Sequence, residues 1–433
     1  MLKRSKYTTI LKSENEYIFY NACTGQHATV HKDEVYMGYI EENADYEYYE
    51  QTIAKSTMEM LIKKGFFITC NLDEEQLLQD FIQKDYSETE NLRITLIPTM
   101  QCNFLCKYCY QDHNPRKMSE EIMNAVIKFV INEMKRFDTI KIAWFGGEPL
   151  CALDSIYSTM RKIAIAAAVN KVKLESAMST NGYLLKPDVF KQLYGLGVYG
   201  YQITVDGPAH IHDSFRIKSN GDPTFEQIMS NLLYIRDNQA YDRARILIRI
   251  NMSNKLLPYM EEFIRYLGST FGQDHRFLID FQQMTDMGGP GIESVREEII
   301  GKQQDVSHYL KILREYQVGN REQDVLVNKG GYVCYAGRKN AYVIDVEGNV
   351  RKCTVALNDE INCIGYIDKM GQMHLDKLKA AMWNEKVGCH ELAKCKFYPL
   401  CFGKACPYKA ILGKQYLCRK ENCITYLKAM EEA

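Results

Sequence analysis

Six short apolar segments alternate with amphipathic segments between residues 92 and 282, and this alternation constrains the fold more than any other feature. The apolar segments have the length of buried strands: 92–98, 139–145, 173–179, 199–205, 244–250 and 276–282. The segments between them have helical periodicity, as in 119–136, where Ser119 is a candidate N-cap. Alternating strands and helices predict an α/β fold with a parallel sheet and right-handed crossovers, either open and doubly wound or an incomplete barrel.

The loops after the first four predicted strands carry the residues that we expect to form a site. In a parallel sheet such loops gather at the carboxyl rim, where ligands bind. The first loop holds Cys102, Cys106 and Cys109, and the next three hold GGEP (146–149), TNG (180–182) and DGP (206–208).

The three cysteines of the first loop are one short of the four ligands of a closed metal site. Three thiolates can hold three irons of a [4Fe–4S] cluster and leave the fourth iron open to a ligand. Zinc completed by a distant His or Cys is the alternative, and His113 lies nearby in the sequence. Zinc usually draws on paired Cys-x2–4-Cys arms, and only one arm is visible here.

Cysteine usage and charge limit the cellular context and the partners. Of the fifteen cysteines, three lie at 102–109 and nine at 334–423. No apolar run approaches the roughly 18 residues of a membrane span, and the N-terminus lacks the apolar region of a signal peptide. We therefore predict a cytoplasmic protein with no membrane partner, in which metal binding is a better explanation of the thiols than disulfides. The net charge of −1 gives no electrostatic reason to expect nucleic acid.

The spacing Cys-x3-Cys-x2-Cys, here CNFLCKYC, resembles the signature of radical S-adenosylmethionine (SAM) enzymes. The resemblance implies a partial (β/α)6 TIM barrel whose open iron chelates SAM, and SAM cleavage to a 5′-deoxyadenosyl radical that abstracts a substrate hydrogen. It also implies a set of cofactor-binding residues: Tyr108, Gly146, Gly147, Glu148, Ser179, Asn181, Thr204 and Arg216. Family members often have Ser at the position of Thr204, so the hydroxyl is retained here.

The C-terminal cysteines resemble the SPASM extension of these enzymes, which implies two auxiliary [4Fe–4S] clusters and three clusters in all. By this analogy Cys334, Cys353 and Cys406 serve the first, and Cys395, Cys401 and Cys418 serve the second. Cys389 and Cys423 would complete the sets in an order left open. Leu392 stands where the pattern has a cysteine, and CFGKAC has one residue too many between its cysteines. Zinc ribbons are the alternative for this segment.

The N-terminal residues resemble the winged-helix-like modules that recognise the leader of a precursor peptide. Residues 15–32 predict a hairpin that turns at Thr24-Gly25, and 53–62 predict a helix that ends near Gly65, with a returning strand at "GFFI". Such modules can bind a leader as an added strand, and a purely structural cap is the alternative. We divide the chain into a recognition module (1–85), a radical SAM barrel (90–310) and a SPASM domain (330–433).

These resemblances together imply an oxidoreductase that matures a ribosomally made peptide by an oxidative thioether or carbon–carbon cross-link. The implied partners are the precursor peptide with its leader and an external flavodoxin- or ferredoxin-type electron donor. One alternative is an anaerobic sulfatase-maturating, formylglycine-generating enzyme, but that group has an Asp base where this chain has Thr354. The other is an iron–sulfur electron carrier, which has no use for GGEP, STNG or Arg216. No catalytic base is assigned from the sequence.

Overall fold

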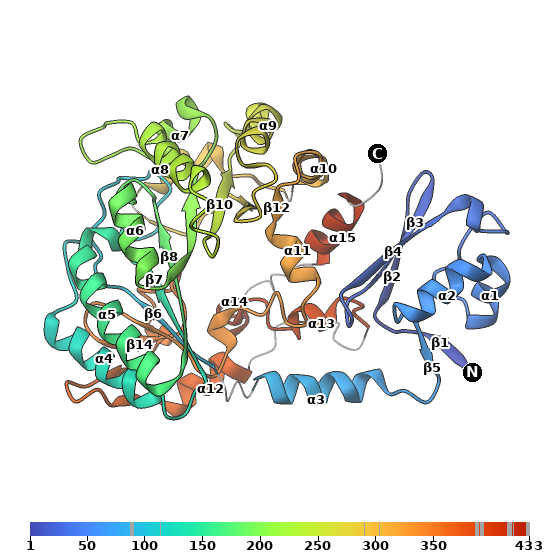
Figure 1. Cartoon of the computed structure of the whole chain (residues 1–433), viewed down its shortest axis with the longest axis horizontal. Helices are drawn as coiled ribbons and strands as arrows, with labels where there is room; N and C mark the ends of the chain where they lie inside the picture. Colours follow the sequence, from blue (N-terminus) through green and yellow to red (C-terminus); the bar gives the residue numbers. More distant parts are fainter. Residues whose placement is uncertain are drawn as a thin grey trace.

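The computed structural model describes residues 1–86, 91–112, 114–289, 291–302, 304–385, 389, 394–413, 418 and 420–429. A barrel-like α/β domain lies on the left of Figure 1, and a small N-terminal module of strands and helices lies on the right. Helix α3 (Glu74–Tyr86) runs between these two parts, and C-terminal helices also lie between them (Figure 1).

Six parallel strands form the centre of the barrel domain, and they lie side by side in chain order. They are β6 (Asn91–Leu96), β7 (Thr139–Trp144), β8 (Lys173–Thr180), β9 (Val198–Thr204), β10 (Arg245–Met252) and β11 (Phe277–Gln283). The predicted strands differ from these bounds by at most two residues at either end. A doubly wound sheet reverses its order at a switch point, whereas this one continues in one direction. The partial barrel is therefore confirmed, and the open doubly wound sheet is wrong.

Alternating burial along these strands separates an apolar outer face from a polar inner face. On β10, Ile246, Ile248 and Ile250 are buried against the helices, while Arg249 and Asn251 on the other face remain partly exposed. Fully burying an aliphatic side chain contributes about 1.5–3 kcal/mol. A slip of one residue would expose the whole apolar row, so the outer face fixes the strand register and leaves the inner face available for binding.

Helices cover the outer face of the sheet (Figure 1). They are α4 (Glu120–Glu133), α5 (Leu153–Asn170), α6 (Pro187–Gly195), α7 (Ala209–Phe215), α8 (Phe225–Asp237) and α9 (Met260–Phe271). The predicted N-cap is confirmed, because the Ser119 hydroxyl accepts a hydrogen bond from the Ile122 N–H at 3.2 Å. Within the described ranges, no helix is both long and apolar enough to cross a bilayer.

The C-terminal part of the chain extends the same sheet at both edges. Strand β12 (Gly319–Asn320) pairs with β11, and β13 (Ala341–Ile344) pairs in parallel with β6. Strands β14 (Asn349–Arg351), β15 (Cys363–Ile367) and β16 (Met373–Leu375) then follow β13 in antiparallel order. The remaining helices are α10 (Ser307–Glu315), α11 (Arg321–Leu326), α12 (Lys377–Glu385), α13 (Tyr398–Cys401), α14 (Pro407–Ile411) and α15 (Lys420–Ala429). The segment that carries Cys353 lies beside the loop that carries Cys102–Cys109, because the Tyr110 hydroxyl donates a hydrogen bond to the Thr354 carbonyl at 3.3 Å.

The N-terminal module contains two small antiparallel sheets and two helices. One sheet has the order β2 (Thr8–Lys12), β3 (Glu16–Asn21) and β4 (Gln26–His31), and the other pairs β1 (Leu2–Arg4) with β5 (Phe67–Thr69). Helices α1 (Tyr46–Thr52) and α2 (Lys55–Lys63) lie between β4 and β5 in the chain. The predicted hairpin, helix and returning strand are confirmed, whereas the winged-helix assignment stays a prediction.

The hairpin turn of this module packs against the backbone of the C-terminal part. Gly25 has φ +68°, and a Cβ added there would lie 2.7 Å from the Cα of Val327. The Tyr20 hydroxyl donates a hydrogen bond to the Leu326 carbonyl at 2.7 Å. Gly25 therefore serves both the turn predicted from the sequence and a close contact that the sequence did not reveal.

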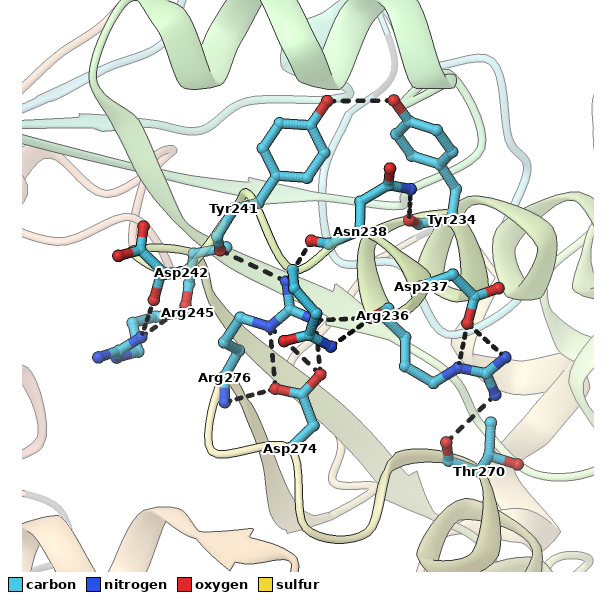
Figure 2. Close-up of polar contacts among 12 residues, drawn as sticks. Tyr234, Arg236, Asp237, Asn238, Tyr241, Asp242, Arg245, Thr270, Asp274 and Arg276 are labelled. Atoms are coloured by element: carbon cyan, nitrogen blue, oxygen red, sulfur yellow. Dashed lines mark hydrogen bonds and ion pairs between the residues drawn. The ribbon is translucent and has the colours of Figure 1, made fainter.

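A buried arginine joins helix α8 to strand β11 at the amino end of the barrel (Figure 2). Arg276 is 1% exposed, and its guanidinium pairs with Asp274 at 2.6 Å. It also donates to the carbonyls of Arg236 at 2.7 Å and Asn238 at 2.8 Å, at the end of α8. These carbonyls have no partner within the helix, so the arginine satisfies them. The network lies at the rim opposite the cysteine loop.

Candidate active site

The three-cysteine loop follows β6 and is held by the last residue of α7 and the segment after it. The Lys107 N–H donates to the Phe215 carbonyl at 3.0 Å, and the Leu105 N–H donates to the Ile217 carbonyl at 2.8 Å. Phe104 is fully buried beneath the loop. The loop is therefore anchored to two elements of the barrel, although the residues that anchor it are more than a hundred positions away.

The thiols of Cys102, Cys106 and Cys109 have the donor chemistry that an iron–sulfur cluster needs. None of them forms a disulfide in the described part of the chain. Burial raises the pKa of Cys106 to about 11, while the nearby Arg216 guanidinium favours its thiolate. Burial raises the pKa of Cys102, and nearby Cys106 and Cys109 add to that rise, so the three thiols lie near one another. His113, the candidate zinc ligand, lies outside the described residues.

The glycine pair after β7 packs directly on the backbone of the cysteine loop. A Cβ on Gly147 would lie 2.3 Å from the Met100 carbonyl oxygen, and one on Gly146 would lie 2.4 Å from that of Thr99. The Glu148 N–H donates to the Gln101 carbonyl at 2.9 Å. The sequence suggested glycine because the chain approaches a ligand, but in the structure the close partner is the backbone of the cysteine loop.

Glu148 links the ends of β7 and β8. Its carboxylate is fully buried and accepts hydrogen bonds from the Leu150 N–H at 3.0 Å, the Thr180 hydroxyl at 2.7 Å and the Asn181 N–H at 2.7 Å. Burial raises the pKa of Glu148, although these bonds oppose the shift. The Asn181 amide donates to the Asn103 side chain at 2.8 Å, so the connection continues into the cysteine loop. Ser179 lies one residue before the end of β8 and is half-buried.

Asp206, after β9, is the centre of a buried polar network. It is 1% exposed and accepts hydrogen bonds from the Asn251 N–H at 2.8 Å and from the Tyr108 hydroxyl. Arg216 lies 3.9 Å from the same carboxylate and donates to the Tyr108 hydroxyl at 2.7 Å. Burial raises the pKa of Asp206, and Arg216 opposes that rise. Tyr108 lies between Cys106 and Cys109 in the chain, so the network ties the cysteine loop to β9, β10 and α7.

Arg216 has an unsatisfied donor that fits an anionic ligand. The residue is 7% exposed, and its Nε has no hydrogen-bond partner among the described residues. A buried unpaired donor costs about 1–3 kcal/mol, which a bound carboxylate would remove. Thr204, at the end of β9, is half-buried and lies in register with Arg249 on the polar inner face. Both residues therefore remain candidates for SAM.

Two features of this rim were not predicted from the sequence. Asn251 donates to Tyr108 at 3.3 Å through its amide and to Asp206 through its backbone. After β11, a Cβ on Gly289 would lie 2.2 Å from the Cys109 carbonyl oxygen, and one on Gly291 would lie 2.2 Å from that of Lys107. The glycine-rich sequence MGGPG after the sixth strand was a usable signal for this second close contact.

The C-terminal cysteines lie in two neighbourhoods. Burial raises the pKa of Cys353 to about 11, with nearby Cys334 and Cys406 adding to the shift. Burial also raises the pKa of Cys395, with Cys389 and Cys418 adding to it. Burial raises the pKa of Tyr398, and Cys401 and Cys389 add to that rise, so both thiols lie near this phenol.

Cys423 differs from the other C-terminal cysteines. It is 1% exposed and belongs to an apolar cluster with Tyr20 and Leu427, against which Cys395 packs. Leu392, where the SPASM pattern has a cysteine, lies outside the described residues. Cys389 lies near Cys395 and so belongs with the second set. A fourth iron ligand for the first set is not among these contacts.

Comparison with known proteins identifies the domain. Residues 96–267 match the family model of the Radical SAM superfamily. The chain is 22% identical over 333 residues to a cysteine-type anaerobic sulfatase-maturating enzyme of Clostridium novyi (strain NT), covering 69% of this chain and 83% of that protein. It is 22% identical over 269 residues to the radical SAM cyclopropyl synthase TigE of Paramaledivibacter caminithermalis, and the match covers 55% of each chain, about half of the length of TigE.

A solved structure supports the same fold. The structure described as native anSMEcpe with bound AdoMet and Cp18Cys peptide has a TM-score of 0.59 and 19% identity, covering 78% of this chain and 96% of that chain. At this identity the likeness shows the fold alone. The region matched by the family model contains the cysteine loop, the glycine pair and the Asp206 network. Residues 96–267 of this chain are therefore a radical SAM domain, a fold that binds SAM and a [4Fe–4S] cluster.

Proposed function

We propose that this protein matures a ribosomally made precursor peptide by abstracting a hydrogen atom from one residue and forming an oxidative thioether or carbon–carbon cross-link. The observation that carries the proposal is that three thiols of a single loop lie at one rim with the buried Arg216 donor, and that this loop contacts the segment of Cys353, which lies near Cys334 and Cys406. When bound, the cluster and SAM would supply a 5′-deoxyadenosyl radical. An external flavodoxin- or ferredoxin-type donor would supply the electron.

Some residues of the rim would bind the cluster and SAM, and others would position the cysteine loop. Cys102, Cys106 and Cys109 would hold the cluster, and the Arg216 Nε together with the Thr204 hydroxyl would hold the carboxylate of SAM. Gly146, Gly147, Glu148, Ser179 and Asn181 would shape the end of the pocket that receives the methionyl amine. The Tyr108 hydroxyl is already engaged by Asp206 and Arg216, so it would position the cysteine loop.

The domain plan is part of the proposal. A recognition module at 1–85 would bind the leader of the peptide, a barrel at 90–310 would hold the radical site, and a SPASM domain at 330–433 would hold two auxiliary clusters. Cys334, Cys353 and Cys406 would serve the first, and Cys389, Cys395, Cys401 and Cys418 would serve the second. Cys423 lies in an apolar cluster, which supports a structural role for it.

The N-terminal module offers an edge strand and exposed aromatic side chains to a peptide. Strand β4 pairs with β3 on one side, and its first two residues, Gln26 and His27, are exposed. The segment after β4 carries Tyr36 and Tyr39, which are 70% and 51% exposed. An extended peptide can add to such an edge through main-chain hydrogen bonds.

The second candidate is sulfatase-type maturation, in which a Cys or Ser of a protein is oxidised to formylglycine. The relative from Clostridium novyi supports it by its name. The position expected for the Asp base is Thr354, however, and its hydroxyl pairs with the Tyr335 hydroxyl at 2.8 Å. A neutral hydroxyl that is already hydrogen-bonded is a much weaker base than an Asp carboxylate. This difference favours the cross-linking reaction.

Anaerobic reconstitution tests the proposal. Iron-loaded protein is mixed with dithionite and SAM, and 5′-deoxyadenosine is measured in the wild type, in Cys106→Ala and in Cys70→Ala, an exposed cysteine of the N-terminal part, as the matched control. The control should match the wild type and Cys106→Ala should form none. Coexpression with short peptides encoded beside the gene, followed by mass spectrometry, then detects a loss of two hydrogens. A protein that binds iron but never cleaves SAM would be an electron carrier.

A further inference from the structure

A hydrogen-bonded pair connects the catalytic cysteine loop to the loop of the first auxiliary set. The Tyr110 hydroxyl donates to the Thr354 carbonyl at 3.3 Å, across 244 positions of the chain. Tyr110 directly follows Cys109, and Thr354 directly follows Cys353. The contact therefore joins two residues that are each bonded to a candidate iron ligand.

Tyr335 extends the same arrangement to a third cysteine. Its hydroxyl accepts a hydrogen bond from the Thr354 N–H at 2.9 Å and pairs with the Thr354 hydroxyl at 2.8 Å. Tyr335 directly follows Cys334. Thr354 is thus held from both sides, by one tyrosine of each cysteine-bearing segment. We call Tyr110, Thr354 and Tyr335 the tyrosine–threonine bridge.

The sheet and local burial hold the bridge in place. Strands β6 and β13 pair in parallel, and the Ile97 N–H donates to the Ile344 carbonyl at 3.0 Å, where β6 leads into the cysteine loop and β13 leads into its turn to β14. Tyr335 packs against an apolar cluster that includes Val350 and Cys353. The Tyr335 ring is packed under the Arg93 guanidinium at 5.5 Å.

We propose that the tyrosine–threonine bridge is the route by which an electron passes between the first auxiliary cluster and the catalytic cluster. This inference rests on the proposed function, because it requires clusters at both sets of cysteines. A continuous chain of covalent bonds and one hydrogen bond runs from Cys109 through Tyr110 to Thr354 and Cys353. Hydrogen bonds next to metal ligands tune the properties of the metal. Their loss commonly lowers metal affinity or activity by about 10–100-fold.

The electron balance defines what the bridge does. After one SAM has been cleaved, the catalytic cluster is oxidised by one electron. One electron then crosses the bridge, which oxidises the auxiliary cluster and reduces the catalytic cluster. That electron breaks the carbon–sulfur bond of a second SAM to give methionine and a 5′-deoxyadenosyl radical, which takes a hydrogen atom from a C–H donor such as glycerol in the buffer. No external reductant is consumed in this second event.

The test uses the reduced holoenzyme without a peptide. Reconstituted protein is reduced with dithionite, desalted without oxygen and mixed with excess SAM. Two quantities are followed over time: the 5′-deoxyadenosine formed, and the electron paramagnetic resonance signal of the reduced auxiliary cluster. We expect a first phase from the catalytic cluster and a second phase that decays together with the auxiliary signal.

Two variants and a matched control isolate the bridge. Tyr110→Phe and Tyr335→Phe each remove one hydroxyl, whereas Tyr201→Phe removes a buried hydroxyl that donates to the Val198 carbonyl at 3.0 Å within β9. The second phase should slow about tenfold in Tyr110→Phe, with an unchanged first phase, and neither phase should change in Tyr201→Phe. If Tyr110→Phe loses iron, Tyr335→Phe decides: it leaves the catalytic loop intact but releases the N–H and hydroxyl of Thr354, whose carbonyl accepts from Tyr110, so the second phase should also slow.

Each other outcome overturns the inference in a recognisable way. An unchanged second phase in Tyr110→Phe and Tyr335→Phe refutes the route. An auxiliary signal that persists in the wild type after SAM cleavage refutes electron transfer between the clusters. If the reconstituted protein contains iron and sulfide for only one cluster, or forms no 5′-deoxyadenosine at all, the proposed function itself is refuted.

Discussion

Removal of the Asp206 carboxylate should destabilise the rim and weaken SAM binding, because this side chain is the centre of the buried network. In Asp206→Ala, the Tyr108 hydroxyl and the Asn251 N–H lose their acceptor, and Arg216 loses a carboxylate 3.9 Å away. Removing one partner of a buried ion pair costs about 3–5 kcal/mol. Part of the cost is shared with the hydrogen bonds, so these contributions do not add.

Asp206→Asn removes the negative charge of this side chain but keeps its shape, so it separates the two contributions. The amide can still accept from the Asn251 N–H, but it has no charge to offer Arg216. We expect a loss of about 1–3 kcal/mol, because hydrogen bonds to charged groups are the strong ones. Stability would be followed as the thermal unfolding midpoint of the iron-free protein without oxygen, and SAM affinity as the SAM-induced change in the spectrum of the reduced cluster.

Asp274→Ala is the matched control. Asp274 pairs with buried Arg276 at the opposite rim, so its loss should lower the unfolding midpoint without changing SAM affinity (Figure 2). For a domain of 150–250 residues, each 1 kcal/mol lowers the midpoint by about 2–4 °C. Asp206→Ala with a wild-type midpoint, or an equal loss of SAM affinity in both variants, would refute the reasoning.

Three further predictions follow from the same contacts. Gly147→Ala should cost about 1–3 kcal/mol and reduce iron binding, since its Cβ would overlap the Met100 carbonyl, whereas Gly195→Ala meets no atom within 4 Å and should bind iron normally. Arg216→Lys keeps the positive charge but loses the paired N–H donors of the guanidinium, so a titration should show SAM affinity reduced about tenfold with normal iron content. Unchanged affinity would exclude Arg216 from the SAM site. Burial opposes ionisation of Asp274, but Arg276 outweighs it and lowers its pKa, so this pair stabilises the fold above the ordinary Asp pKa of about 3.9 and loses that contribution as the pH falls further. The fall of the unfolding midpoint below that pH should be smaller in Asp274→Asn, and an identical fall would contradict the assignment.

The sequence by itself determined the strands of the barrel and the rim on which the site lies. Apolar periodicity is a local property, so β6 to β11 could be placed within two residues, and parallel pairing then put their loops at one edge. The three thiols of the first loop were visible for the same reason, because one short segment carries all of them. The hairpin at Gly25 was also found from its own turn chemistry.

Only the tertiary structure decided which distant residues share a contact. Gly147 is required because the backbone of Met100 lies 2.3 Å from its absent Cβ, and Asp206 is central because Tyr108 and Asn251 meet it from other elements. Tyr110 and Thr354 are 244 positions apart, and nothing in either local pattern indicates their hydrogen bond. Local patterns record how a segment buries its own apolar face, whereas buried polar partners are chosen by the packing of separate segments, which only the folded chain specifies.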